Sequence, residues 1–284
     1  MYNTVIMYYQ DSPMARSKSD WTQAKFERYV KEGRGKGRGK DYKPWITIQD
    51  FPSKGRVSRS PGWKSDRIHH FMSDWELRFF YLLEWSDAVK DIKEQYPLLD
   101  IDLAFCIADE LGIKYPLNSK SKTPYVLTTD FMLTVDRGGK LIQIARTVKL
   151  AKELEKKRVL ELLQLEHNYW KRKNVDWAVV TEHEISKTLA DNVKWVHPAY
   201  KWELAEEKNK DNCCYLSNTL KEQLVTKKVK INIITTALDE KIGIMSGTSL
   251  SLFKHLVAKK EIIVDMPEKK ISGSSNTTII KSII

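Results

Sequence analysis

The chain has 284 residues, of which 42% are hydrophobic, with nine tryptophans and twelve tyrosines. This composition supports a packed core and excludes an intrinsically disordered protein. A net charge of +11 favours a polyanionic partner. No apolar run approaches the ~18 residues of a membrane span, and the first residues lack the pattern of a signal peptide. Three cysteines without C-x-x-C spacing fit a reducing compartment, so we expect a cytoplasmic protein with no membrane association.

A short helix is expected over residues 20–31, and a strongly basic loop follows it. Between Lys25 and Arg67 there are 13 Lys and Arg against 5 Asp and Glu, a net charge of +8. Glycine at every second position, in GRGKGRGK, predicts a flexible segment. The charge fits either a solvated face or a phosphate-binding surface, but no strand precedes the loop as in a nucleotide-binding loop. Three residues directly after it are expected to be buried: Tyr42, Trp45 and Ile46.

The middle of the chain alternates helical and strand patterns. Helical spacing of apolar residues predicts helices over 73–87, 101–111 and 150–173, and strands are expected over 91–99, 125–136, 140–149 and 175–181. Arg137-Gly138-Gly139 provides the positive φ of a tight hairpin turn between the second and third strands. This order predicts a mixed α/β domain spanning residues 1–182.

The sequence pattern changes at residue 183. An irregular segment to about residue 200 is expected, followed by a helical remainder over 201–255. A helix around Phe253 and a strand over 262–264 predict a small winged-helix-like domain over 183–284. The tail after residue 271 is expected to be partly disordered or to add a strand.

Three residues in the first domain have a pattern suited to chemistry. Glu76 lies in the first turn of its helix, Asp130 interrupts an apolar strand, and Lys149 ends the partner strand. The midpoint of positions 130 and 149 falls at the glycine turn, so a hairpin brings the two side chains together. Carboxylates that bind Mg²⁺, with a lysine beside them, are the Asp…(Asp/Glu)-x-Lys arrangement of restriction-type nucleases.

Each of these residues also has a purely structural interpretation. Ser73-Asp-Trp-Glu76 is an ordinary capping box, Asp130 and Lys149 fit a cross-strand ion pair, and Glu166 fits a solvated helix face. His69 and His70 are adjacent, and adjacent histidines rarely bind one ion. The sequence contains no HExxH, Walker A or zinc-finger spacing.

Five blocks of the sequence resemble, in order, the TnsA family of transposon endonucleases. They are KEGRGKGRGKDYKPW, HHFMSDWELRFFYLLEW, DIKEQYPLL, TTDFMLT and LEHNYWKRKNVDWAVVTEHEI. The resemblance implies a restriction-endonuclease-like N-terminal domain that binds Mg²⁺. By the same resemblance, Glu76 is the catalytic acid, Asp130 the metal-binding aspartate and Lys149 the catalytic lysine, and Glu166 is a further active-site acid.

The resemblance also implies partners. Members of this family cut the 5′ ends of a transposon, a separate TnsB-like transposase cuts and joins the 3′ ends, and a TnsC-like ATPase contacts the C-terminal region. One position departs from the family pattern: Thr147 stands where Gln or Glu is usual, and a hydroxyl is a poorer Mg²⁺ ligand than a carboxylate. We expect the basic residues Arg34, Lys36, Arg38 and Lys40 to contact DNA phosphates.

The sequence therefore supports two hypotheses of different classes. The first is a Mg²⁺-dependent endonuclease that cuts double-stranded DNA at transposon ends within a transposase complex. The alternative is a non-catalytic subunit that binds DNA and bridges transposase and ATPase, which Thr147 favours. A free-standing nuclease is a third and weaker option.

Overall fold

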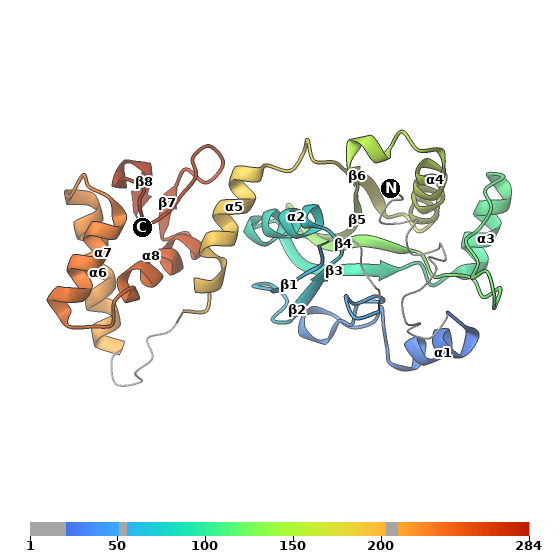
Figure 1. The fold of residues 1–284 in the computed structure, drawn as a ribbon, viewed down its shortest axis with the longest axis horizontal. Coiled ribbons are helices and arrows are strands. Elements are labelled where there is room, and N and C mark those ends of the chain that lie inside the picture. Colours follow the sequence, from blue (N-terminus) through green and yellow to red (C-terminus); the bar gives the residue numbers. More distant parts are fainter. Residues whose placement is uncertain (1–20, 51–55, 203–209, 284) are drawn as a thin grey trace. The chain divides into compact units, whose positions relative to one another are not determined.

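The computed structural model describes residues 21–50, 56–202 and 210–283. The chain divides into two compact units, Met1–Ile185 and Ser186–Ile284 (Figure 1). The first is mixed α/β and the second is mainly helical, as the sequence predicted. Within the described ranges, no helix is long and apolar enough to cross a membrane.

A four-stranded sheet forms the centre of the first unit. Its order is β3 (Val89–Pro97), β4 (Thr128–Arg137), β5 (Lys140–Val148) and β6 (Asp176–Val180). The β3–β4 and β4–β5 pairs are antiparallel, while β5 and β6 are parallel. Parallel neighbours need a crossover, which η3 (Ala151–Glu153) and α4 (Lys157–Arg172) provide. The sequence had predicted one helix over 150–173 where the structure has two pieces.

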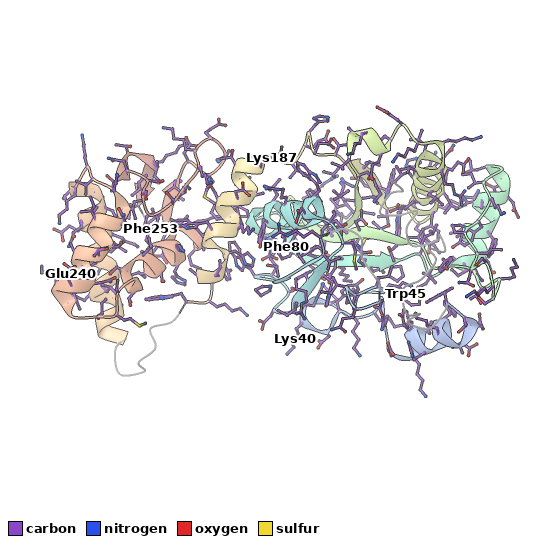
Figure 2. The ribbon with its side chains drawn as sticks, viewed as in Figure 1. Lys40, Trp45, Phe80, Lys187, Glu240 and Phe253 are labelled. Carbon is purple, nitrogen blue, oxygen red and sulfur yellow. The ribbon has the colours of Figure 1, made fainter. Side chains whose placement is uncertain are left out.

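Alternate residues of β4 pack on opposite faces of this sheet. Phe131 lies against Phe79 of α2 (Asp74–Trp85), with ring centroids 5.5 Å apart. Its neighbour Met132 belongs to the core under α3 (Ile101–Glu110) and α4. Both faces are therefore covered by helices, and β4 is buried along most of its length (Figure 1). Phe80 of α2, labelled in Figure 2, is fully buried.

The sequence missed a hairpin that precedes α2. Strands β1 (Ser58–Pro61) and β2 (Ile68–Phe71) pair antiparallel. They are short, and their sequences, Ser-Arg-Ser-Pro and Ile-His-His-Phe, lack apolar alternation, so tertiary contacts decide their conformation. The predicted first helix is present as α1 (Gln23–Lys31), with Thr22 as its N-cap.

The second unit is built from helices and one small sheet. Its elements are α5 (Lys187–Val196), η4 (His197–Ala199), α6 (Lys210–Thr226), α7 (Ile231–Ile242), α8 (Thr248–Ala258), β7 (Ile262–Val264), η5 (Thr277–Ile279) and β8 (Ile280–Ile283). Phe253 lies fully buried in its core (Figure 2). The tail adds a strand, since β8 pairs antiparallel with β7.

The prediction of an irregular segment between residue 183 and about residue 200 was wrong at α5. The Ser186 hydroxyl accepts a hydrogen bond from the Leu189 N–H and starts this helix. Ala190, Val193 and Val196 then form a fully buried stripe at three-residue spacing. Polar residues between these three positions obscured the helical period.

Candidate active site

Glu76 occupies the N3 position of α2, and its carboxylate is held from several sides. Ser73 is the N-cap, and its hydroxyl accepts the Glu76 N–H at 3.1 Å and donates to Glu76 Oε1 at 3.0 Å. The Met72 N–H donates to Oε2 at 2.9 Å. The capping interpretation is therefore correct, and the same contacts fix a buried carboxylate at the end of a helix.

The β4–β5 hairpin brings Asp130 and Lys149 together. Lys149 Nζ donates to Asp130 Oδ2 at 3.3 Å and to the carbonyl of Val148 at 3.0 Å. The Val148 N–H donates to the same Asp130 oxygen at 2.8 Å. The aspartate side chain therefore accepts a main-chain hydrogen bond where the β4–β5 pairing ends. All three groups are buried.

The register of this hairpin differs from the expected one. Arg137 pairs with Lys140 across Gly138 and Gly139, both at positive φ, and the ladder runs to Phe131 opposite Arg146. In this register Thr147 lies across from Asp130, and Lys149 lies two residues further along. The turn is centred one residue earlier than Lys149 opposite Asp130 would require, and a shift of one residue in the turn changes the pairing by two. The contact still forms because the long lysine side chain reaches diagonally across the strands.

Glu166 projects from α4 into a set of hydrogen-bond donors. Its Oε1 accepts the hydroxyls of Thr129 and Thr147, each at 2.6 Å, and the indole N–H of Trp177 at 3.0 Å. Glu166 is buried, so the interpretation as a solvated helix residue was wrong. Thr147, the departure from the family pattern, directs its hydroxyl to Glu166.

Burial and like charge govern the ionisation of the acids. Burial, reinforced by the negative charge of Asp130, raises the pKa of Glu76 to about 8. Burial likewise raises the pKa of Glu166 to about 7. Burial alone would lower the pKa of Lys149, but the surrounding carboxylates, Asp130 foremost, outweigh it and raise that pKa. The lysine is therefore a cation held among acids.

The donor set fits a divalent cation of the Mg²⁺ type. Glu76 and Asp130 offer carboxylate oxygens, and Val148 offers a main-chain carbonyl beside them. Two buried acids that repel each other are stabilised by a cation that both contact. Over the described residues, no group of three or more His, Cys, Asp or Glu side chains is placed to hold a metal ion. Two carboxylates completed by water and substrate oxygens are a usual Mg²⁺ site.

The basic loop is a folded element in which the glycines have specific roles. Gly35 and Gly37 have φ of +78° and +95°, and a Cβ there would lie 2.4 Å from Pro97 Cγ and 2.3 Å from the Asp41 carbonyl oxygen. The Gly35 N–H donates to the Lys43 carbonyl and the Lys43 N–H to the Lys36 carbonyl. The glycines therefore permit close packing of the loop, whereas the sequence had suggested flexibility.

The four basic residues of this loop fall into two groups. The Arg34 guanidinium contacts Asp50 at 2.8 Å and Glu32 at 2.7 Å, and it lies 3.5 Å from the centroid of the Tyr29 ring. It holds the loop to α1. The exposed members are Lys36, Arg38 and Lys40. Tyr42, Trp45 and Ile46 are buried as predicted, and Figure 2 labels Trp45 and Lys40.

Of the two adjacent histidines of β2, His69 is held between two side chains. His69 Nδ1 lies 2.7 Å from Glu94 Oε2, and its Nε2 lies 2.6 Å from the Ser65 hydroxyl. Glu94 also binds Arg67, whose guanidinium lies 2.5 Å from Glu94 Oε2. Burial opposes ionisation of Glu94, but His69 and Arg67 outweigh it and hold its pKa far below the usual range.

Comparison with known proteins places this chain in a family. The description "TnsA-like endonuclease N terminal" matches residues 86–182, and "TnsA endonuclease C terminal" matches residues 184–266. The chain is 40% identical over 194 residues to the transposon Tn7 transposition protein TnsA of Escherichia coli. The aligned region covers 68% of this chain and 70% of that protein. The chain belongs to the TnsA endonuclease family. The resemblance read from the sequence is thereby confirmed.

The candidate site residues lie partly inside and partly outside the matched range. Asp130, Lys149 and Glu166 lie inside the N-terminal family match, whereas Glu76 precedes its first residue. Its electrostatic interactions with Asp130 and Lys149 show that Glu76 lies near both in space. Sequence reasoning missed Gln95, whose side-chain amide donates to Glu76 Oε2 at 3.3 Å. Its only signal was a polar side chain within a predicted strand.

Proposed function

We propose that this TnsA-family chain is a Mg²⁺-dependent DNA endonuclease that cuts the 5′ strands at transposon ends during cut-and-paste transposition. Its first unit would be restriction-endonuclease-like. The observation that carries the proposal is the buried Asp130–Lys149 contact at the end of the hairpin, next to the buried Glu76. Burying charged groups is costly, and such clusters occur mainly where chemistry requires them.

Asp130 and Glu76 would hold the metal through their carboxylate oxygens. A bound Mg²⁺ supplies Lewis-acid stabilisation of the phosphate and lowers the pKa of a bound water. Met72 and Ser73 orient the Glu76 carboxylate toward this role through the helix cap. Because burial and the charge of Asp130 raise the pKa of Glu76, cation binding would favour loss of its proton.

Lys149 would act on the reacting phosphate. Water attacks phosphorus, one phosphorus–oxygen bond of the DNA backbone breaks, and negative charge builds up on the phosphoryl oxygens. A lysine held cationic beside them stabilises this charge. Asp130 fixes the ammonium group in place. Glu166 would support the site from α4 through its bonds to Thr129 and Thr147.

The remaining surfaces suit double-stranded DNA and protein partners. Lys36, Arg38 and Lys40 are exposed on the basic loop and would neutralise phosphates without reading sequence. The second unit, with helices followed by a two-stranded sheet, would act as a winged-helix-like docking domain. The partners would be a TnsB-like transposase and a TnsC-like ATPase, as the Tn7 relative's role in transposition suggests.

The feature that favoured the non-catalytic alternative, Thr147, has a partner in the acid cluster. Thr147 raised the doubt because a hydroxyl replaces a usual ligand. In this chain that hydroxyl donates to Glu166 at 2.6 Å, so the position contributes to the acid cluster. The buried acids and lysine then remain unexplained by a docking role alone.

A strand-resolved cleavage map tests the proposal. Transposon-end DNA is incubated with Mg²⁺, the cognate TnsB-like transposase and either wild type, Asp130→Ala or Glu155→Ala. Glu155 is exposed and serves as the matched acidic control. We expect 5′-strand cuts with wild type and the control, and 3′ cuts alone with Asp130→Ala. If wild type adds no 5′ cut while 3′ cuts appear, the docking alternative replaces the endonuclease.

A further inference from the structure

Gln95 combines an unusual backbone conformation with a place at the centre of the site. It lies inside β3 at φ +49°, although it is not glycine, and it is 1% exposed. Glu94 pairs with Phe131 and Tyr96 with Thr129, so Gln95 lies across from Asp130. A left-handed residue in the middle of a buried strand is strained, and such strain persists where surrounding contacts impose it.

Contacts on both sides impose this conformation. The Gln95 carbonyl accepts the Trp45 N–H at 3.2 Å, which ties β3 to the anchor of the basic loop. The preceding carbonyl, that of Glu94, accepts the Tyr42 hydroxyl at 3.0 Å. Glu94 itself is held by Arg67 and His69.

The side chain uses this conformation to reach Glu76. Gln95 Nε2 donates to Glu76 Oε2 at 3.3 Å, and Gln95 Oε1 accepts the Thr128 hydroxyl at 3.1 Å. The two partners fix the orientation of the amide, because a carboxylate oxygen accepts and the hydroxyl donates. With Met72 and Ser73, Gln95 completes three donors on one carboxylate, and it alone comes from the sheet.

We infer that Gln95 is a positioning residue that holds Glu76 in its metal-binding orientation, an inference that rests on the proposed Mg²⁺-dependent endonuclease. The helix cap fixes one end of Glu76, while Gln95 ties the carboxylate to the strand opposite Asp130. The two acids thus keep the relative position that one cation requires. Residues that orient metal ligands in this way typically change metal affinity by about tenfold or more when replaced.

Two substitutions distinguish the effect of the Gln95 side-chain amide from the effect of its backbone conformation. Gln95→Leu keeps the bulk and removes both hydrogen bonds. Gln95→Gly removes the side chain but accepts positive φ without strain, so the strand keeps its shape. Gln143→Leu is the matched control, because Gln143 is an exposed glutamine of the same sheet.

Metal binding is measured on the full chain without DNA, by titration with Mn²⁺ followed by electron paramagnetic resonance. We expect half-saturation to move about tenfold higher in both Gln95 variants and to stay at the wild-type value in Gln143→Leu. In the cleavage assay, excess Mg²⁺ restores the rate of the Gln95 variants, while the DNA concentration for half-maximal rate does not change. Thr128→Val, which removes the donor to Gln95, shifts half-saturation in the same direction by less.

The outcomes separate this inference from the proposed function. If the wild type binds Mn²⁺ and cuts, but the Gln95 variants titrate like Gln143→Leu, the positioning role is overturned and the endonuclease stands. Lower thermal stability with unchanged Mn²⁺ affinity likewise overturns it, since Gln95 is then only structural. If wild type binds no metal and makes no cut, the proposed function fails, and the inference fails with it.

Discussion

The two units of this chain differ in the charges that they bury. The first buries seven carboxylates among its described residues: Glu76, Glu84, Asp91, Glu94, Asp130, Glu153 and Glu166. Among the described residues of the second unit, the one buried carboxylate is Asp239. It caps α8 by accepting the main-chain N–H groups of Gly247 at 2.7 Å and Ser249 at 2.8 Å.

This difference separates a structural use of buried charge from a functional one. The Asp239 carboxylate accepts two main-chain N–H groups at a helix start, which compensates its loss of water. Burial instead opposes ionisation of Glu76, and the negative charge of Asp130 adds to that cost. Buried acids with a raised pKa concentrate at functional sites, and the first unit contains two of them, Glu76 and Glu166.

Replacing Lys149 should have the largest effect on both activity and stability. Lys149→Met leaves the buried acids without their cation, so we expect the free energy of unfolding in EDTA to fall by about 3 kcal/mol. The cleavage rate should fall by about a hundredfold or more. Urea unfolding and the strand-resolved assay measure the two effects. Lys140→Met, in the exposed turn of the same hairpin, should match wild type in both.

Replacing Glu76 should stabilise the metal-free protein while abolishing cleavage. The folded-state pKa lies at about 8 against an ordinary 4.5, so the unfolded chain loses this proton first as pH rises. The free energy of unfolding therefore falls from about pH 4.5 to pH 8. In Glu76→Gln this fall should be smaller, by about 1 kcal/mol or more.

Urea unfolding in EDTA at pH 5 and pH 8 tests this expectation. The free energy of unfolding of Glu76→Gln minus that of wild type should be larger at pH 8 than at pH 5. An equal pH dependence in both proteins would show that neither burial nor the charge of Asp130 raises the pKa of Glu76. Glu155→Gln, on the surface, should reproduce the wild-type dependence.

Replacing Asp239 tests the structural use of a buried carboxylate in the second unit. Asp239→Ala removes a helix cap, so we expect a loss of about 1 kcal/mol that does not depend on divalent cations. Thermal unfolding with and without Mg²⁺ measures this loss, and Mn²⁺ titration should give the wild-type affinity. A changed affinity would contradict the separation between the two kinds of buried charge.

Charges on the surface of the basic loop should affect neither stability nor metal binding. Replacing Lys36, Arg38 and Lys40 with Gln should lower the slope of log affinity for DNA against log salt by about 3 or less. Salt-dependent DNA binding by fluorescence anisotropy measures the slope. Arg34→Gln should instead lower the melting temperature, because its guanidinium joins Asp50 and Glu32. An unchanged slope in the triple variant would remove the loop from the DNA interface.

Local sequence patterns predicted those parts of the fold and site that depend on neighbours in the chain. The glycine turn predicted the hairpin that joins Asp130 to Lys149, and the capping box predicted the start of α2. The exact pairing was missed by two residues, because a turn of fixed sequence accommodates more than one register.

Features imposed by distant contacts were not visible in the sequence. The β1–β2 hairpin lacks apolar alternation, and its His69 finds a partner in Glu94, 25 positions away. Glu166 looked like a solvated helix residue until Thr129, Thr147 and Trp177 surrounded it. The positive φ of Gln95 depends on contacts with the basic loop, which no propensity encodes.

The site is assembled from four separate elements, and this has a consequence during synthesis. Glu76 is on α2, Asp130 on β4, Lys149 follows β5 and Glu166 is on α4. A ribosome has completed most of the first unit before Glu166 appears, and only the sheet and its two helix layers bring the four groups together. A nascent or partly unfolded chain therefore lacks the assembled cluster, so the endonuclease activity proposed above would require the completed first unit.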